Sequence, residues 1–361
     1  MLVAPAFEET QVQPASLDLR LGSHAFRLRC SFLPGKNDTV ADQIETFRVG
    51  PPIDLSSGAI LERNRPYLIP LQETLQLPTR VRGRANPKSS TGRLDVFTRV
   101  ITDRWAQFDD IRPGYEGPMY LEVVPRSFAV MVQQGLALNQ LRLMTGEIGV
   151  SDDELRAAHR NSPLLYRPNG QPLNRRDVRA RDGVWLSLDL LKRNGSAVGY
   201  RARHNSSLIN MALVNHYNPS DYWEPVVPEV GNRVVLEPED FYLLLSAEAV
   251  RVPPDYAAEM TALDPSGGEV RTHYAGFFDP GFGHAEGFFS SGSRAALEIR
   301  AHDVPFAVDH LQRVCALRFE RMAETPTVFY GPAQKSHYQG QLSTLSKHFK
   351  VDQAPDHVTF S

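Results

Sequence analysis

The stretch Asn86–Leu94 has the residue types of a phosphate site. It gathers two cations and three hydroxyl side chains around one glycine: Lys88, Ser89, Ser90, Thr91, Arg93 and Gly92. Lysine and arginine bind phosphate oxygens, and a glycine lets backbone amides approach a ligand closely. The composition has two interpretations, a phosphate-binding loop or a solvated turn before the next element.

Three carboxylates stand within or beside apolar, strand-like runs. Glu122 lies in Met119–Val124, and Glu298 lies in a similar context. A carboxylate in such a strand either faces solvent by alternation or is desolvated, where it can act as a general base. Alternation alone favours the solvent-facing position. Asp279 ends a short apolar run before Pro280-Gly281, which suits either holding a ligand hydroxyl or making the turn.

A polar, glycine-bearing segment near the C-terminus combines a cation, an aromatic residue and an amide: Lys335, Tyr338 and Gln339. It has no strand pattern. One interpretation is a frayed tail, and the other is a lid that closes over a ligand.

The spacing of the histidines argues against a zinc site. The 11 histidines form neither His-x-x-x-His nor His-Glu-x-x-His. The zinc signature of most nucleobase deaminases, His-x-Glu followed by Pro-Cys-x-x-Cys, is also absent. We therefore expect no protein zinc site.

Composition narrows the class of protein. The 361 residues carry 39 Lys+Arg and 42 Asp+Glu, a net charge of −3, which argues against a protein that coats nucleic acid. Cys30 and Cys315 are too few for a disulfide scaffold. No apolar run is long enough for a membrane helix, and the N-terminal residues lack a signal-peptide pattern. We expect a cytoplasmic protein with about two domains.

Short apolar runs between the 27 prolines and 25 glycines predict a mostly β fold with few helices. The clearest helix signal is Ser151–His159, where Ser151 and Glu154 match a capping box. It is followed by a turn-rich stretch that resembles a linker. We expect domains at 1–150 and 181–361, joined by a helix and linker at 151–180.

The two predicted domains share ordered sequence matches, which predict two copies of one domain. Ser16-Leu-Asp-Leu19 recurs at 187–190, and Tyr67, Glu73 and Pro78 recur 175 residues later. Pro113-Gly-Tyr, Leu121-Glu122 and Phe128-Ala-Val have further counterparts at 280–282, 297–298 and 306–308.

Together these stretches resemble the dCTP deaminase and dUTPase superfamily. Gln13–Gly22 is similar to the opening motif of dCTP deaminases, and Lys88–Leu94 to their Arg-Ser-Ser-x-Gly-Arg motif. Pro113–Gly117 resembles the hairpin before their catalytic glutamate, and Tyr338–Gln341 resembles their nucleotide-closing tail. The length and the repeat resemble the long, duplicated form of the family.

The resemblance implies tandem distorted β-barrel (jelly-roll) domains, a trimer or larger homo-oligomer, and zinc-independent deamination of dCTP to dUTP. Mg²⁺ would enter with the triphosphate. Glu122 would be the base, Ser89 would hydrogen-bond near the reacting carbon, and Arg93 would stabilise developing charge. The remaining residues implied to bind nucleotide are Lys88, Ser90, Thr91, Gly92, Ala275, Asp279, Lys335, Tyr338 and Gln339. dTTP is a possible inhibitor, as in relatives.

Each copy departs from the family pattern in a different half. The first has Arg112 where the family has the sugar-binding aspartate, whereas the second keeps Asp279 with Ala275 four residues before it. The second copy lacks Ser-Ser-x-Gly-Arg and reads Asp264-Pro-Ser-Gly-Gly-Glu-Val-Arg271 instead. One hypothesis is a composite site that uses Asp279 and Glu298 with Ser89 and Arg93.

The simpler hypothesis keeps Glu122 as the base, and spacing favours it. Arg112 precedes Glu122 by ten residues, as in single-domain enzymes, whereas Asp279 precedes Glu298 by nineteen. Two further functions stay open. The first is a dUTPase or bifunctional enzyme, for which Asp18, Asp189 and Asp279 are available. The second is a nucleotide-binding β module without catalysis.

Overall fold

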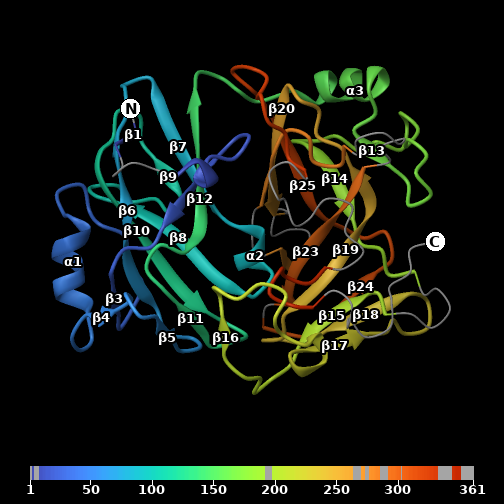
Figure 1. Ribbon diagram of the computed structural model, residues 1–361. Helices are drawn as coiled ribbons and strands as arrows, with labels where there is room; N and C mark the ends of the chain where they lie inside the picture. The colour runs from blue at the N-terminus through green and yellow to red at the C-terminus, as the bar shows by residue number, and fades with distance from the viewer. Residues whose placement is uncertain are drawn as a thin grey trace. The chain divides into compact units, whose positions relative to one another are not determined.

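The computed structural model is mostly β, with α1 and α3 as its longer helices (Figure 1). It describes residues 2–3, 8–191, 197–262, 270–272, 276–284, 292–301, 303–331 and 344–350. The chain divides into two compact units. Unit 1 comprises Met1–Glu147 with Asn205–His216, and unit 2 comprises Ile148–His204 with Tyr217–Ser361. No helix in the described ranges is both long and apolar enough to cross a membrane.

Unit 1 has three sheets. The largest has the order β4-β3-β6-β10-β8, with β1 also paired to β6; the others are β2-β12-β7-β9 and β16-β11-β5. The strands are β1 Leu2–Val3, β2 Leu17–Arg20, β3 His24–Arg27, β4 Ile53–Asp54, β5 Ala59–Leu61, β6 Tyr67–Gln76, β7 Val81–Pro87, β8 Val96–Thr102, β9 Asp110–Ile111, β10 Glu116–Pro125, β11 Val130–Val132, β12 Ala137–Thr145 and β16 Ile209–Asn210. The helices are η1 Glu9–Gln11, α1 Val40–Phe47 and α2 Ser89–Gly92.

Unit 2 repeats this plan. Its sheets have the orders β17-β15-β19-β23-β21, with β13 on β19, then β14-β25-β20-β22, and the pair β18-β24. The strands are β13 Leu165–Tyr166, β14 Val184–Ser187, β15 Gly199–Ala202, β17 Trp223–Val226, β18 Arg233–Leu236, β19 Tyr242–Val250, β20 Tyr256–Ala262, β21 Val270–Thr272, β22 Phe277–Phe278, β23 Ser293–Ala301, β24 Phe306–Asp309 and β25 Arg313–Arg321. The helices are α3 Asp152–Asn161 and η2 Pro219–Asp221.

Strand register establishes which residues of the two copies correspond. Glu122 of β10 faces Leu68 of β6, and Glu298 of β23 faces Leu243 of β19. The hydroxyl of Tyr67 accepts the Glu62 amide at 3.2 Å, and the hydroxyl of Tyr242 accepts the Glu237 amide at 3.0 Å. The 175-residue tyrosine match and the Leu-Glu match are therefore confirmed.

Two of the sequence matches are displaced in register. Arg20 of β2 faces Ala137, and Ser187 of β14 faces Arg313 in the equivalent ladder. Ser187 thus corresponds to Arg20 rather than to Ser16, so that match is wrong by four residues. By the same comparison, Phe306 opposite Leu236 corresponds to Val130 opposite Leu61. Both matches are displaced by an even number of residues. Because side chains alternate along a strand with a period of two, such a displacement leaves the apolar residues on the same face and is not visible in the pattern.

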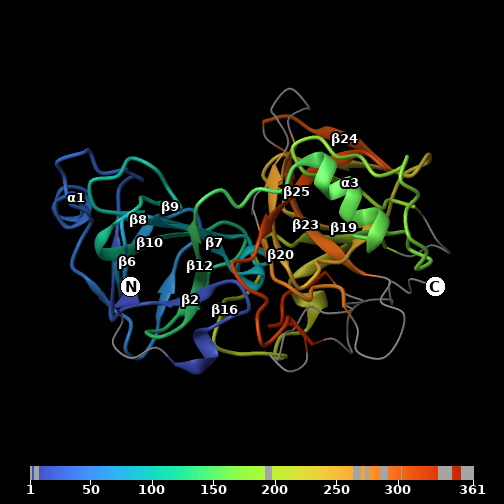
Figure 2. The same ribbon diagram turned by 90° about the horizontal axis from the view of Figure 1, so that it is seen from above.

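The segment 151–180 contains the expected helix, and its capping box is confirmed. The Ser151 hydroxyl accepts the Glu154 amide, and the Glu154 carboxylate accepts the Ser151 amide. The rest of the segment differs from a free linker, because Leu164, Leu165 and Val178 join the hydrophobic core of unit 2 together with Leu155 of α3. Figure 2 shows the ribbon of α3 together with the strands of unit 2. Burial of these side chains attaches the segment to the second unit.

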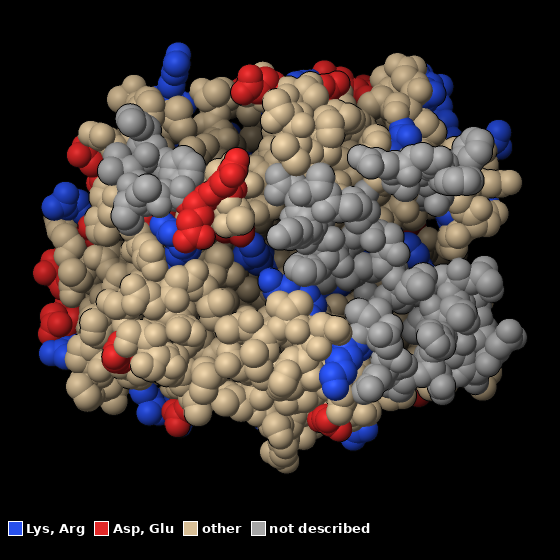
Figure 3. Space-filling view, viewed as in Figure 1, with Lys and Arg blue, Asp and Glu red and all other residues tan. Residues whose placement is uncertain are grey.

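Charges are mixed over the surface. On the face shown in Figure 3, cationic and anionic side chains are interspersed around uncharged areas, in keeping with the net charge of −3. A polyanion would meet both signs of charge on this face.

Candidate functional site

The opening motif and the Ser-Ser-Thr-Gly-Arg motif meet in unit 1. Lys88 precedes α2, and its ammonium group makes a short ion pair with the carboxylate of Asp18 in β2. The strand β12 joins the two motifs, since Gln140 lies opposite Asp18 on one side and opposite Asn86 on the other. Sheet pairing therefore places Lys88 beside an aspartate that lies 70 positions away from it in sequence.

Helix α2 is a single buried turn. Ser89 is half-buried, whereas Ser90, Thr91 and Arg93 are buried. The amides of Thr91 and Gly92 both donate to the carbonyl of Lys88, at 2.8 and 3.0 Å. The helical turn therefore uses the amides that were expected to cradle phosphate, and side chains are left for that role. The Thr91 hydroxyl is buried without a hydrogen-bond partner in the described structure, which suits a ligand contact.

Glu122 is fully buried in β10 and does not face solvent. One of its oxygens, Oε2, accepts Nε and Nη2 of Arg99 at 2.9 and 2.5 Å. The guanidinium of Arg99 lies 3.5 Å from the ring centroid of Phe108 and also donates to the Ser31 hydroxyl at 2.9 Å. The other oxygen, Oε1, is buried and has no partner within the described ranges. A fixed arginine thus neutralises this carboxylate.

Sequence reasoning missed Arg99. It stands mid-strand in β8, directly opposite Glu122 in the β8–β10 ladder. A charged residue inside the apolar run Val96–Thr102 was a signal, but pairing it with Glu122 required the register of the two strands.

The hairpin before each glutamate is confirmed as an equivalent element. Ile111 faces Gly83 of β7, and Phe278 faces Ala258 of β20, so the next residues, Arg112 and Asp279, occupy equivalent positions. Arg112 donates to the Arg104 carbonyl at 3.1 Å and remains in the half-buried range. Asp279 is buried, with 7% of its surface exposed.

The tyrosine of the first hairpin is a structural residue. Burial raises the pKa of Tyr115 to about 12. Its hydroxyl donates to the Pro118 carbonyl at 2.6 Å and accepts the Asp103 amide at 3.2 Å. These bonds hold the turn in which Gly114 has φ +70°.

Glu298 lies in β23 at the strand position that corresponds to Glu122, with 9% of its surface exposed. Both copies thus contain a buried glutamate at the equivalent position of their equivalent sheets. The four remaining predicted residues, Ala275, Lys335, Tyr338 and Gln339, lie outside the described residues, as does most of the stretch 264–271. In the part of the chain that is described, no group of three or more His, Cys, Asp and Glu side chains is placed to hold a metal ion.

Both halves of the chain match known protein families. Residues 2–147 match the family described as "2'-deoxycytidine 5'-triphosphate deaminase (DCD) N-terminal domain", and residues 151–349 match the family of the corresponding C-terminal domain. The crystal structure of 2'-deoxycytidine 5'-triphosphate deaminase from Agrobacterium tumefaciens aligns with a TM-score of 0.82 and 44% identity, over 89% of this chain and 94% of that one.

Curated relatives match over a shorter region. "dCTP deaminase, dUMP-forming" from Methanobrevibacter smithii is 34% identical over 137 residues, which is 37% of this chain and 66% of the relative. The protein of the same name from Beutenbergia cavernae is 32% identical over 136 residues, or 37% of this chain and 67% of the relative. The chain thus spans about two thirds of the length of these relatives. The two domain families together match nearly all of the chain and cover both structural units. The chain therefore belongs to the dCTP deaminase family.

Proposed function

We propose that this protein hydrolyses dCTP to dUTP and ammonia. Water adds to C4 of cytosine, the C4–N4 bond breaks, and the proton taken from water leaves with the amino group. The observation that carries the proposal is the junction of Lys88, α2 and Asp18, because it fixes the Ser-Ser-Thr-Gly-Arg motif beside the opening motif. The similarity to the Agrobacterium tumefaciens enzyme supports it.

Ser89 and Arg93 are proposed to contact the reacting part of the base, and Lys88 with the Ser90 and Thr91 side chains to hold phosphate. Binding of the triphosphate competes with Asp18 for the Lys88 ammonium. Mg²⁺ enters with the triphosphate. Ala275, Lys335, Tyr338 and Gln339 keep the nucleotide-binding roles that the family resemblance implies, and Gly92 is proposed only to let the ligand approach α2 closely.

We assign the general base to Glu298 and a structural role to Glu122. Glu122 is held by Arg99 through one oxygen, and its other oxygen is buried. The second copy also keeps Asp279, whose equivalent in the first copy is Arg112. An aspartate suits the sugar hydroxyl, whereas arginine offers only donors there. The glutamate of the copy with the aspartate is therefore the better candidate to take the proton from water.

We further propose that each unit is a dUTPase-like distorted barrel and that the chain assembles as a trimer or multiple of trimers. The matching sheet orders of units 1 and 2 support a common domain plan.

A second activity, release of diphosphate to give dUMP, is favoured by the names of the curated relatives, which are dUMP-forming dCTP deaminases. It needs a water in line with the α-phosphate, and an aspartate is the usual group to orient it. Of the aspartates considered, Asp18 is paired with Lys88, and Asp189 accepts Arg294 at 2.7 Å. Asp279 is buried at the position after β22 and is the aspartate that the second copy would offer.

The test is incubation of the purified protein with dCTP and Mg²⁺, with nucleotides resolved by anion exchange and ammonia assayed in parallel. dUTP with stoichiometric ammonia supports deamination, and dUMP with diphosphate supports the bifunctional alternative. Unchanged dCTP and dUTP would favour a binding module without catalysis.

The two glutamates are separated by Glu298→Gln and Glu122→Gln. We expect Glu298→Gln to lower kcat by at least about a hundredfold, the usual contribution of a general base. Glu122→Gln should retain most of its kcat per folded molecule. Full activity of Glu298→Gln would exclude it as the base.

A further inference from the structure

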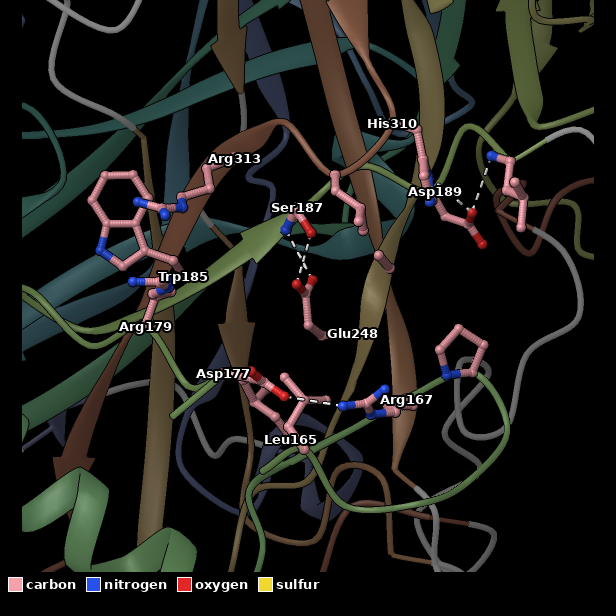
Figure 4. Close-up of a pocket in the computed structure, with 15 residues that line it drawn as sticks. Leu165, Arg167, Asp177, Arg179, Trp185, Ser187, Asp189, Glu248, His310 and Arg313 are labelled. Atoms are coloured by element: carbon pink, nitrogen blue, oxygen red, sulfur yellow. Dashed lines mark hydrogen bonds and ion pairs between the residues drawn. The ribbon is translucent and has the colours of Figure 1, made fainter. Parts of the chain in front are cut away.

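Unit 2 contains a cavity of about 520 Å³ (Figure 4). Neither Asp279 nor Glu298 is among the residues that line it. This volume is in the range of sites that bind small molecules. The apolar lining includes Leu165, Leu173, Leu191 and Leu311. The polar lining includes Arg167, Asp177, Arg179, Ser187, Asp189, Glu248, His310 and Arg313.

The duplication explains why the cavity is open. In unit 1 the equivalent carboxylate, Glu73, is fully buried and accepts Arg20 Nε at 2.8 Å and Gln11 Nε2 at 2.9 Å. The Arg20 amide also donates to it, at 2.8 Å. Side chains of the protein thus fill the space around Glu73.

In unit 2 the arginine position is Ser187, a much smaller residue. Glu248 accepts the Ser187 amide at 2.9 Å and its hydroxyl at 2.7 Å. A carboxylate has about four lone-pair positions, so Glu248 can accept two more donors. The hydrogen bond from the backbone amide to the glutamate is the same in both copies. The side-chain nitrogen donors that Arg20 and Gln11 supply in unit 1 have no counterpart at Glu248 in the described structure, where Glu248 lines the cavity. A ligand with N–H donors fits that space.

Two cations of the lining are not committed to carboxylates. Arg167 pairs with Asp177 at 3.0 Å, and Asp189 pairs with Arg294 at 2.7 Å. By contrast, Arg179 makes no ion pair within the described structure, and Arg313 has only its contact with the Trp185 ring, 5.5 Å from its centroid. Figure 4 draws both arginines on the Trp185 side of the cavity, with Glu248 and Ser187 toward the middle. Free guanidinium groups suit phosphate.

Trp185 is fixed in orientation because its indole Nε1 donates to the Arg181 carbonyl at 2.9 Å. A rigid aromatic side chain in a lining that also contains leucines suits a planar ring. The cavity therefore offers an acceptor for N–H groups, an aromatic and aliphatic wall, and a pair of cations.

We propose that this cavity binds a purine nucleotide whose base carries an amino group. The amino group donates to Glu248, the ring packs against Trp185 and the leucine side chains, and the phosphates bind Arg179 and Arg313. The ligand is bound and not consumed. This site is additional to the one proposed for dCTP and does not depend on it.

Calorimetry with the two-unit chain tests the proposal, with dATP, dITP and tripolyphosphate as probes. dITP has an oxygen at C6 in place of the amino group and a proton on N1, so it removes the exocyclic donor to Glu248 and puts an acceptor in its place. We expect one dATP bound per chain, with dITP and tripolyphosphate weaker by about tenfold or more, since a hydrogen bond to a charged group has about that effect.

Arg179→Ala/Arg313→Ala should weaken dATP binding by about tenfold or more, while kcat/KM for dCTP stays unchanged. Both residues are exposed, so their removal should preserve the fold. Arg176→Ala is the matched control, since Arg176 is exposed nearby and does not line the cavity. Glu248→Gln should abolish the preference for dATP over dITP.

The proposal is overturned if dATP binds the double arginine variant as tightly as the unaltered protein, or if tripolyphosphate binds as tightly as dATP. Equal binding of dATP and dITP would overturn the role of Glu248. These outcomes are separate from dCTP turnover, which the same preparations report independently.

Discussion

The pair Arg99–Glu122 offers the sharpest test of the structure of unit 1. Arg99→Met removes the guanidinium and keeps an unbranched apolar side chain beside Phe108. Glu122, which is 0% exposed, would then keep its charge without a partner. Breaking a buried pair by removing one partner costs about 3–5 kcal/mol. Because 23% of the Arg99 side chain is exposed and water can enter there, we expect the lower end, about 3 kcal/mol.

Hydrogen–deuterium exchange measures this effect locally, which is appropriate because a chain with two units need not unfold in one step. The amides of Glu116–Pro125 should exchange about a hundredfold faster in Arg99→Met. Those of the equivalent strand, Ser293–Ala301, should not change.

Two variants control the measurement. Arg27→Met breaks the exposed pair with Glu62, whose side chains are 37% and 56% exposed, and should cost less than about 1 kcal/mol. Arg99→Met/Glu122→Gln leaves no buried charge and should be more stable than Arg99→Met alone. If Arg99→Met were no more disruptive than Arg27→Met, the buried pair would not be holding β8 to β10.

Three further predictions follow from burial and capping. Burial raises the pKa of both Tyr115 and Tyr200 to about 12, so the folded state retains protons that the unfolded state loses above pH 10; stability should be fully present below pH 10 and fall as the pH rises toward 12, by about 2–3 kcal/mol for each tyrosine. Urea midpoints from pH 8 to 11.5 check this, with Tyr115→Phe flattening the slope, and an unchanged slope would contradict it. Cys30 is exposed whereas burial raises the pKa of the Cys315 thiol, so an aromatic disulfide reagent should label one thiol in native protein and two in denaturant; rapid labelling of both in native protein would refute the burial of Cys315. Ser151→Ala removes the N-cap of α3 and should cost about 1 kcal/mol, measured by urea denaturation against Ser151→Asp, which retains a cap; equal losses in the two variants would argue against capping.

Local pattern was enough to predict several elements. The capping box at Ser151 depends on residues within a few positions of one another, so its chemistry is visible in sequence. The tyrosine match of the repeat was visible for the same reason. The hydroxyl of each tyrosine, Tyr67 and Tyr242, accepts a hydrogen bond from a backbone amide only five residues earlier, so the same local contact kept the same residue in both copies.

Register was harder to predict. The Ser16 match at 187 was wrong by four residues because a strand shifted by an even number keeps the same side chains inward. The linker expected after α3 was also misjudged, since Leu164, Leu165 and Val178 are apolar residues scattered among turn residues and only the finished core reveals their burial.

The sequence by itself determined the family, the mostly β class and the motif residues, because these depend on residue identity and short spacing. Tertiary structure decided what those residues contact. It joined Lys88 to Asp18 across β12, gave Glu122 to Arg99 instead of solvent, and used the Thr91 and Gly92 amides within α2. It also opened a cavity where Ser187 stands in place of an arginine. The physical reason is that cross-strand neighbours are set by pairing and burial over the whole sheet, which no local stretch of sequence specifies.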